Sequence, residues 1–390
     1  MIDDRTKEFI RLHRNDDPRS LALQAKRYPG VDMHEVAVQV EGWQAAKEKL
    51  PEWAAIDGIV YPPKISMEQC SGEAAAKYKA TLVSGGSLAD LTGGFGIDFS
   101  YMARNMKSAT YIERNDNLCS IARNNFPLLG LKHAAVVNGN SEELLPSLER
   151  QDWIYLDPAR RSDAGGKVVA LADCEPDVSA MEDALLSKAG KVLVKCSPML
   201  DISLACRQLK NVEAVHVVAV NNECKELLIV LGSRSADIPV HCVDIRSGDV
   251  GEFVYTMQEE QRSGCSFTNE VRLYLYEPCS VIQKAGCHNT LSSRLGLSKL
   301  HPNSQLYTSD ALVRSFPGRA FRVIDVTGFS KQDVKRVQSL QKANIAVRNF
   351  PDSVQQLRKR LKLADGGDVY IFATTLGKGE KVLVICKKPE

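Results

Sequence analysis

A carboxylate ends one of the most apolar stretches of the chain, in IYLDPARRSD at residues 154–163. Asp157 is followed by Pro158, which stiffens the backbone, and then by Arg160 and Arg161. A strand-end carboxylate can accept hydrogen bonds from a ligand, and the arginines can bind phosphate or stack on a base. The alternative is that the arginines only neutralise Asp157. The long segment PARRSDAGGKVVALADCEP favours a functional loop.

A second candidate site is the turn ADLTGGFGID at residues 89–98. Its glycines let the backbone approach a ligand, although ordinary turns also use glycine. Asp90 can receive an ammonium group, and Glu113 follows 23 residues later, close to the spacing of an acid that binds a ribose diol. Asn140, in NGNSEELL, can read the edge of an adenine ring. This series of polar residues favours a nucleotide-like cofactor over solvated strand ends.

The elements between these residues must bring them to one edge of a sheet. From about residue 86, short apolar runs alternate with helical stretches, and the first five runs are far enough apart for crossover helices. Only four residues separate Val220 from Lys225, so the last two strands are antiparallel neighbours. We predict a Rossmann-like α/β sheet of seven strands with the last antiparallel. This is the topology of class I methyltransferases, and dinucleotide-binding dehydrogenases do not usually end this way.

The chain of 390 residues is long enough for several domains. Residues 1–80 are predicted to be helical, with Ser66 as the N-cap of a helix that runs through EAAAKYKATL. Residues 81–235 form the predicted sheet domain, 236–320 a connecting or ferredoxin-like region, and 321–390 a compact α+β module.

Two motifs resemble those of class I S-adenosylmethionine-dependent methyltransferases. DLTGGFG is similar to their first motif, with Thr92 where many members have glycine, and Asp157-Pro158 resembles the Asp-Pro-Pro motif of nucleobase-methylating enzymes. In that motif Arg160 replaces an aromatic residue that stacks on the flipped base. The resemblance implies S-adenosylmethionine as cofactor and a pocket made of Asp90, Thr92, Gly93, Gly94, Gly96, Glu113, Asn140 and Asp157. It assigns the catalytic role to Asp157, Pro158 and Arg160.

A further catalytic candidate lies in VKCSPML, which is similar to the stretch that carries the nucleophilic cysteine of RNA 5-methyluridine enzymes. Cys196 would add to a pyrimidine ring, and Lys195 could lower its pKa. Ten other cysteines make a bystander thiol the stronger reading. Glu223 and Lys225 could line the same edge or be solvated hairpin residues.

The charge is unevenly distributed, because residues 311–390 carry 16 Lys and Arg against 7 Asp and Glu while the whole chain has a net charge of only +2. The motif blocks along nearly the whole chain, among them YEPCSVIQKAG, LYTSD, FPGRAF and RNFP, resemble a bacterial family of class I methyltransferases with a C-terminal THUMP-like domain. That resemblance implies RNA binding, although THUMP domains often precede the catalytic domain. The RNA-contact candidates are Arg160, Arg161, Arg314, Arg319, Arg322, Arg348, Arg358, Lys359, Arg360 and Lys362, each of which could be an ordinary surface charge.

The resulting hypothesis is a methyltransferase that modifies a nucleobase in tRNA or rRNA. The alternatives are a methyltransferase acting on a protein or small molecule, and a non-catalytic RNA-binding protein with the same fold. We expect no metal, because the seven histidines and eleven cysteines lack ligand spacing. No apolar run is long enough to span a membrane and no signal peptide is visible, so we expect a cytoplasmic protein with reduced cysteines.

Overall fold

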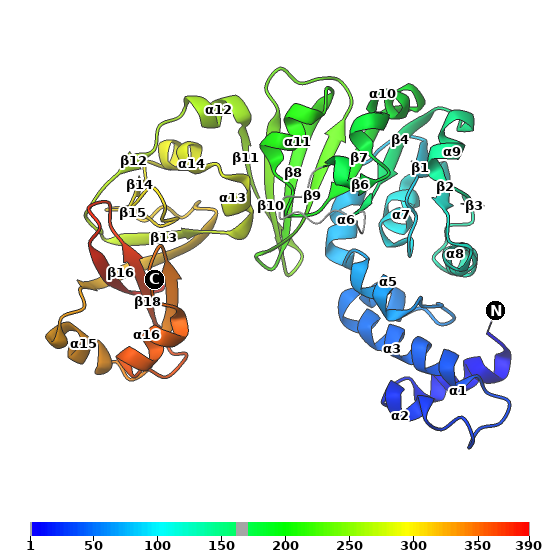
Figure 1. The fold of residues 1–390 in the computed structure, drawn as a ribbon, viewed down its shortest axis with the longest axis horizontal. Coiled ribbons are helices and arrows are strands. Elements are labelled where there is room, and N and C mark those ends of the chain that lie inside the picture. Colours follow the sequence, from blue (N-terminus) through cyan, green and yellow to red (C-terminus); the bar gives the residue numbers. More distant parts are fainter. Residues whose placement is uncertain (1, 161–170, 390) are drawn as a thin grey trace. The chain divides into compact units, whose positions relative to one another are not determined.

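The computed structural model describes residues 2–160 and 171–389, which divide into two compact units (Figure 1). The first unit comprises Met1–Val220 and Lys225–Ala236, and the second comprises Asn221–Cys224 and Asp237–Glu390. Within the described residues, no helix is both long and apolar enough to cross a bilayer.

The chain begins with a helical region, as predicted. Asp32 caps its longest helix by accepting hydrogen bonds from the N–H groups of His34 and Glu35. Ser66 is not an N-cap: it lies inside a short helix that follows Pro63, and the chain is extended at Cys70 before the next helix begins. The single predicted helix is therefore two. The helices are α1 (Asp4–His13), α2 (Pro18–Ala22), α3 (Met33–Lys49), α4 (Pro51–Ala54), α5 (Lys64–Gln69) and α6 (Glu73–Leu82).

A mostly parallel sheet forms the rest of the first unit, with the order β8-β9-β7-β4-β1-β2-β3. Trp153, Ile154, Tyr155 and Leu156 are all buried, as expected where helices cover both faces of a parallel sheet. The strands are β1 (Ser87–Asp90), β2 (Ser108–Glu113), β3 (Ala134–Asn138), β4 (Gln151–Leu156), β7 (Ala189–Cys196), β8 (Val212–Val220) and β9 (Glu223–Leu231). The helices are α7 (Ile97–Met102), α8 (Asp116–Leu128), α9 (Ser141–Leu144), α10 (Val178–Lys188) and α11 (Ile202–Gln208).

The predicted antiparallel end of the sheet is present, since β9 runs antiparallel to β7. Its connection to β8 is a turn of two asparagines, Asn221 and Asn222, with φ angles of 51° and 63°. Asparagine tolerates this left-handed conformation, and two such residues match the tight turn of a hairpin. The loop is thus shorter than the four residues expected. Two short strands, β5 (Ala159–Arg160) and β6 (Cys174–Glu175), form a separate antiparallel ladder after β4.

The second unit contains a hairpin of β10 (Pro239–Arg246) and β11 (Asp249–Thr256) and a sheet of order β12-β14-β15-β13-β16-β19-β18-β17. The four strands and two helices predicted for residues 321–390 are present, although α15 ends at Gln338, before Gln341 takes a left-handed φ of 62°. The strands are β12 (Ser266–Phe267), β13 (Tyr274–Pro278), β14 (Ser298–Lys299), β15 (Tyr307–Ser309), β16 (Gly318–Thr327), β17 (Asn344–Arg348), β18 (Val369–Thr375) and β19 (Lys381–Lys387). The helices are α12 (Met257–Arg262), α13 (Ser280–Ala285), α14 (His288–Leu295), α15 (Lys331–Gln338) and α16 (Val354–Leu361).

Candidate active site

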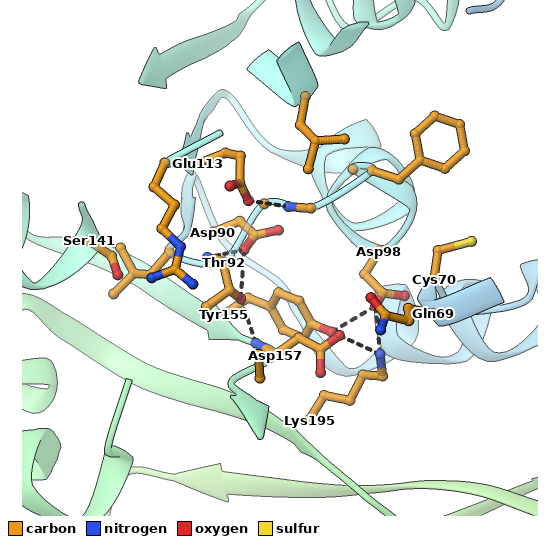
Figure 2. Close-up of a pocket in the computed structure, with 18 of the residues that line it drawn as sticks. Gln69, Cys70, Asp90, Thr92, Asp98, Glu113, Ser141, Tyr155, Asp157 and Lys195 are labelled. Carbon is orange, nitrogen blue, oxygen red and sulfur yellow. Dashed lines mark hydrogen bonds and ion pairs between the residues drawn. The ribbon is translucent and has the colours of Figure 1, made fainter. Parts of the chain in front are cut away.

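A cavity of about 520 Å³ opens at the carboxyl edge of the parallel strands in the first unit (Figure 2). The turns after β1, β2, β3 and β4 contribute to its lining together with Lys195 near the end of β7, because parallel strands end at the same edge. All eight residues predicted to bind the cofactor line it: Asp90, Thr92, Gly93, Gly94, Gly96, Glu113, Asn140 and Asp157. The end of α5 and the chain after it also contribute Gln69, Cys70 and Ser71, which the sequence did not indicate.

The glycine turn after β1 is shaped by its neighbours. A Cβ on Gly93 would lie 2.3 Å from the Tyr111 ring, so no side chain fits there. Gly94 and Gly96 have φ angles of 56° and 81°, which favour glycine. The Tyr111 hydroxyl also donates to the carbonyl of Gly94 at 2.5 Å. These contacts with Tyr111 fix the conformation of the turn. Its residues line the cavity.

Glu113 connects the end of β2 to the glycine turn. Its Oε2 accepts a hydrogen bond from the N–H of Gly94 at 2.8 Å, and its Oε1 accepts one from the N–H of Asn115 at 2.8 Å (Figure 2). Asn140 ends the next turn and caps α9 through the N–H of Glu142 at 2.8 Å. Both residues line the cavity, and both side chains also accept hydrogen bonds from nearby backbone N–H groups.

Asp90 is 1% exposed at the end of β1, and burial raises the pKa of its carboxyl well above the usual range. Its Oδ1 accepts a hydrogen bond from the N–H of Thr92 at 2.9 Å. The Thr92 hydroxyl in turn accepts one from the N–H of Asp157 at 2.6 Å. One short chain of hydrogen bonds therefore joins the ends of β1 and β4.

Asp157 is paired with Lys195, whose Nζ lies 2.5 Å from Asp157 Oδ2 (Figure 2). Lys195 also lies 4.0 Å from Asp98, at the start of α7. Asp98 accepts hydrogen bonds from the hydroxyls of Tyr155 at 2.7 Å and Ser71 at 2.8 Å. Sequence reasoning missed Asp98 and Tyr155, because an acid in the first helical turn and a strand tyrosine are common structural features.

Asp98 also belongs to a network of buried ion pairs with Lys79 and Glu226. Lys79 is fully buried in α6, with its Nζ 3.1 Å from Asp98 Oδ1 and 2.5 Å from Glu226 Oε1. Burial raises the pKa of Asp98, but the ammonium groups of Lys79 and Lys195 outweigh it, so the carboxyl stays ionised. Buried charges of this kind are stable only when they are paired.

The other residues considered for catalysis do not line the cavity where the structure describes them. Cys196 is buried and does not line the cavity, and burial raises the pKa of its thiol well above the usual range. Pro158 lies between two lining residues, Asp157 and Ala159. The backbone of Arg160 pairs with Cys174, and Arg161 lies outside the described residues. The exposed Glu223 and Lys225 do not line the cavity.

Several RNA-contact candidates in the second unit are engaged in ion pairs. Arg348 and Arg319 both contact the buried carboxylate of Glu277, which is 4% exposed. Arg358 pairs with Asp365 at 2.6 Å, and Arg360 lies 3.5 Å from Asp352. The other candidates are exposed: Arg314, Arg322, Lys359 and Lys362.

The cavity fits S-adenosylmethionine in its charge and backbone shape. The described residues that line it include two cations, Arg114 and Lys195, and six carboxylates: Asp90, Asp98, Glu113, Glu142, Asp157 and Glu175. This excess suits a ligand with an ammonium and a sulfonium group. No cluster of three or more His, Cys, Asp or Glu side chains in the described ranges is arranged to hold a metal.

The strand order and the polar edge define a class I methyltransferase fold with a THUMP-like C-terminal part. Residues 318–388 match the family described as THUMP domain-like, and residues 274–317 match a ferredoxin-like domain. The crystal structure of a proposed methyltransferase from Porphyromonas gingivalis W83 is 37% identical over 100% of both chains, with a TM-score of 0.92. The chain therefore belongs to the family of that protein.

Two other solved structures match part of the chain at low identity. A proposed class I S-adenosylmethionine-dependent methyltransferase of Listeria monocytogenes is 10% identical over 62% of this chain and 93% of its own, with a TM-score of 0.38. The tRNA (uracil-54, C5)-methyltransferase of Pyrococcus abyssi, in complex with S-adenosyl-L-homocysteine, is 18% identical over 41% and 38%, with a TM-score of 0.32. No curated protein matches the sequence.

Proposed function

We propose that the protein is an S-adenosylmethionine-dependent methyltransferase that modifies a nucleobase in RNA, either tRNA or rRNA. The observation that supports this best is the position of Asp157, at the end of β4 and in the same cavity as the glycine turn and Glu113. A cofactor and a carboxylate that can hold a methyl acceptor would thus share one site.

Each side of the cavity has a distinct task in this proposal. Glu113 and Asn140 would hold the ribose and adenine, and Asp90 with the glycine turn would hold the amino-acid part. When bound, S-adenosylmethionine supplies an electrophilic methyl group whose bonding electrons remain on sulfur. Asp157 accepts a hydrogen bond from an N–H of the base, and it can take the proton that the nitrogen loses on gaining the methyl group.

Nitrogen is the better acceptor atom for this site. Methylation of C5 in a pyrimidine needs a thiolate that adds to the ring. Cys196 is buried away from the cavity and its raised pKa keeps it protonated. Methylation of a nitrogen needs no such nucleophile, because Asp157 can bind the N–H of an amino or imino group directly.

The RNA part of the proposal is supported by the THUMP-like residues 318–388 and by the excess of basic residues there. The test is to compare modified nucleosides in tRNA and rRNA from wild-type and deletion strains by mass spectrometry. Loss of one methylated nucleoside, restored by the wild-type gene but not by Asp157→Ala, is expected. Unchanged RNA, with methyl transfer from labelled S-adenosylmethionine to a protein or small molecule, would replace RNA as the substrate. No binding of the cofactor at all would contradict the enzyme proposal.

A further inference from the structure

The sequence suggested only that Lys195 could lower the pKa of Cys196, yet Lys195 lines the proposed active site near the end of β7. We propose that Lys195 is a positioning residue, which holds one oxygen of the Asp157 carboxylate so that the other is presented to the methyl acceptor. This inference rests on the proposed function of the cavity.

Two contacts fix Asp157 in place. Its main-chain N–H is bound by Thr92 at 2.6 Å, and its Oδ2 lies 2.5 Å from Lys195 Nζ. Oδ1 receives no hydrogen bond from the part of the chain that the structure describes. The Asp157 side chain is 38% exposed, so an acceptor group can reach it. Lys195 therefore decides which oxygen is available.

Lys195 is itself held rigidly, with only 13% of its side chain exposed. Burial lowers its pKa, but the carboxylates of Asp157, Asp98 and Glu226 outweigh burial and raise the pKa above the usual range, so the ammonium is retained. The titratable groups around this pair come from six elements and the segment between α5 and α6: Lys79, Asp90, Asp98, Tyr155, Cys196, Glu226 and Cys70. Lys195 is the cation that directly contacts Asp157 among the described residues.

Without that ammonium, Asp157 would face Asp98 and Asp90 with no direct counterion. The Asp157 side chain would then lose the contact that fixes its orientation towards the acceptor. A displaced carboxylate would be poorly placed to take the proton of the acceptor nitrogen. The rate of methyl transfer should therefore fall more than the affinity for RNA or for the cofactor.

The test compares Lys195→Met, Lys195→Arg and Lys191→Met in the full-length protein. Lys191 is a matched control, because it lies on the same strand and pairs with Glu213 at 2.5 Å but does not line the cavity. The kcat and KM of methyl transfer from labelled S-adenosylmethionine to RNA of the deletion strain are measured at one pH, and the affinity for S-adenosylhomocysteine is measured by calorimetry. The ¹³C signal of the Asp157 carboxyl, identified by its loss in Asp157→Asn, is recorded in parallel at the same pH without RNA.

For Lys195→Met we expect kcat to fall by about tenfold or more while KM and the affinity for S-adenosylhomocysteine stay near wild type, because small displacements of a reacting group are costly. The carboxyl signal should shift or broaden in this variant. Lys195→Arg should restore most of the rate, and Lys191→Met should resemble wild type. An unchanged carboxyl signal in Lys195→Met would overturn the inference. If no variant, including wild type, methylates RNA, the proposed substrate fails, while the carboxyl signal still decides the role of Lys195.

Discussion

The N–H of Asp157 donates a hydrogen bond to the hydroxyl of Thr92 at 2.6 Å, which joins the loop after β4 to the glycine turn after β1. Thr92 stands where many class I methyltransferases have glycine, and a glycine could not make this contact. The threonine at this position therefore sets the position of Asp157 relative to the glycine turn.

Replacement of this hydroxyl by a methyl group should uncouple the two loops. In Thr92→Val the Asp157 N–H loses its acceptor, so we expect a loss of about 1 kcal/mol in unfolding free energy, measured by urea denaturation. Methyl transfer should fall by about tenfold or more, because small displacements of a reacting group are costly. Thr92→Ser keeps the hydroxyl and should stay near wild type. Equal rates in Thr92→Val and wild type would contradict this role.

Glu113 should control cofactor affinity. Glu113→Ala removes the proposed ribose ligand and also frees the N–H of Gly94, so calorimetry should show a tenfold or greater loss of affinity for S-adenosylhomocysteine, about 1.4 kcal/mol or more. Glu143→Ala is the matched control, since Glu143 is exposed in α9 and does not line the cavity. Similar affinities in both variants would refute the assignment of Glu113.

Asp90 should make the protein less stable as the pH rises. Because burial raises its pKa in the folded state, the folded form binds the proton more tightly than the unfolded form. The contribution of Asp90 to folding stability is therefore complete below about pH 4, the pKa of its carboxyl in the unfolded chain. This contribution is lost as the pH rises through the higher pKa of the folded state. Asp90→Asn keeps an acceptor for Thr92, so its Tm should exceed that of wild type at pH 8 but not at pH 4. Its affinity for S-adenosylmethionine should nevertheless fall.

Arg348 and Lys359 were both predicted to contact RNA. Their structural surroundings lead us to expect a loss of stability on replacing Arg348 and a loss of RNA affinity alone on replacing Lys359. Arg348→Ala removes one of two cations from the buried Glu277, so thermal denaturation should show a lower Tm. Adding Glu277→Gln should recover part of that loss. A Tm equal to that of wild type would show that the ion pair contributes no stability.

Lys359 is exposed on α16 and should act only on binding. For Lys359→Ala we expect an unchanged Tm and a slope of log affinity against log salt concentration that is shallower by about one in filter binding of tRNA. An unchanged slope would remove Lys359 from the set of phosphate contacts.

The sequence predicted the parts of the site that depend on local pattern. Asp90, Glu113 and Asp157 each end or follow an apolar run, and parallel strands bring such ends together, so the cavity could be anticipated without coordinates. The helices and strands of residues 321–390 could also be predicted, because the alternation of apolar and polar residues and the turn residues mark each of them. Both signals depend only on residues that are close in the sequence.

Side-chain pairs between distant residues could not be read in this way. Lys79 and Glu226 are 147 positions apart, and Arg348 reaches Glu277 from another strand. A basic residue looks the same in sequence whether it meets solvent, RNA or a buried acid, so the ion pairs of the arginines in the second unit could not be foreseen. Ser66 was assigned as an N-cap because its local motif was suitable, whereas the extended backbone at Cys70 divides that helix.

The wall of the cavity that Gln69, Cys70 and Ser71 form has a consequence for dissection of the protein. A fragment that starts at the first strand would keep every motif residue but would lose this part of the lining. The smallest fragment that keeps the whole cavity must therefore begin before α5. Any ligand that fills the cavity should then also stabilise the folding of this segment.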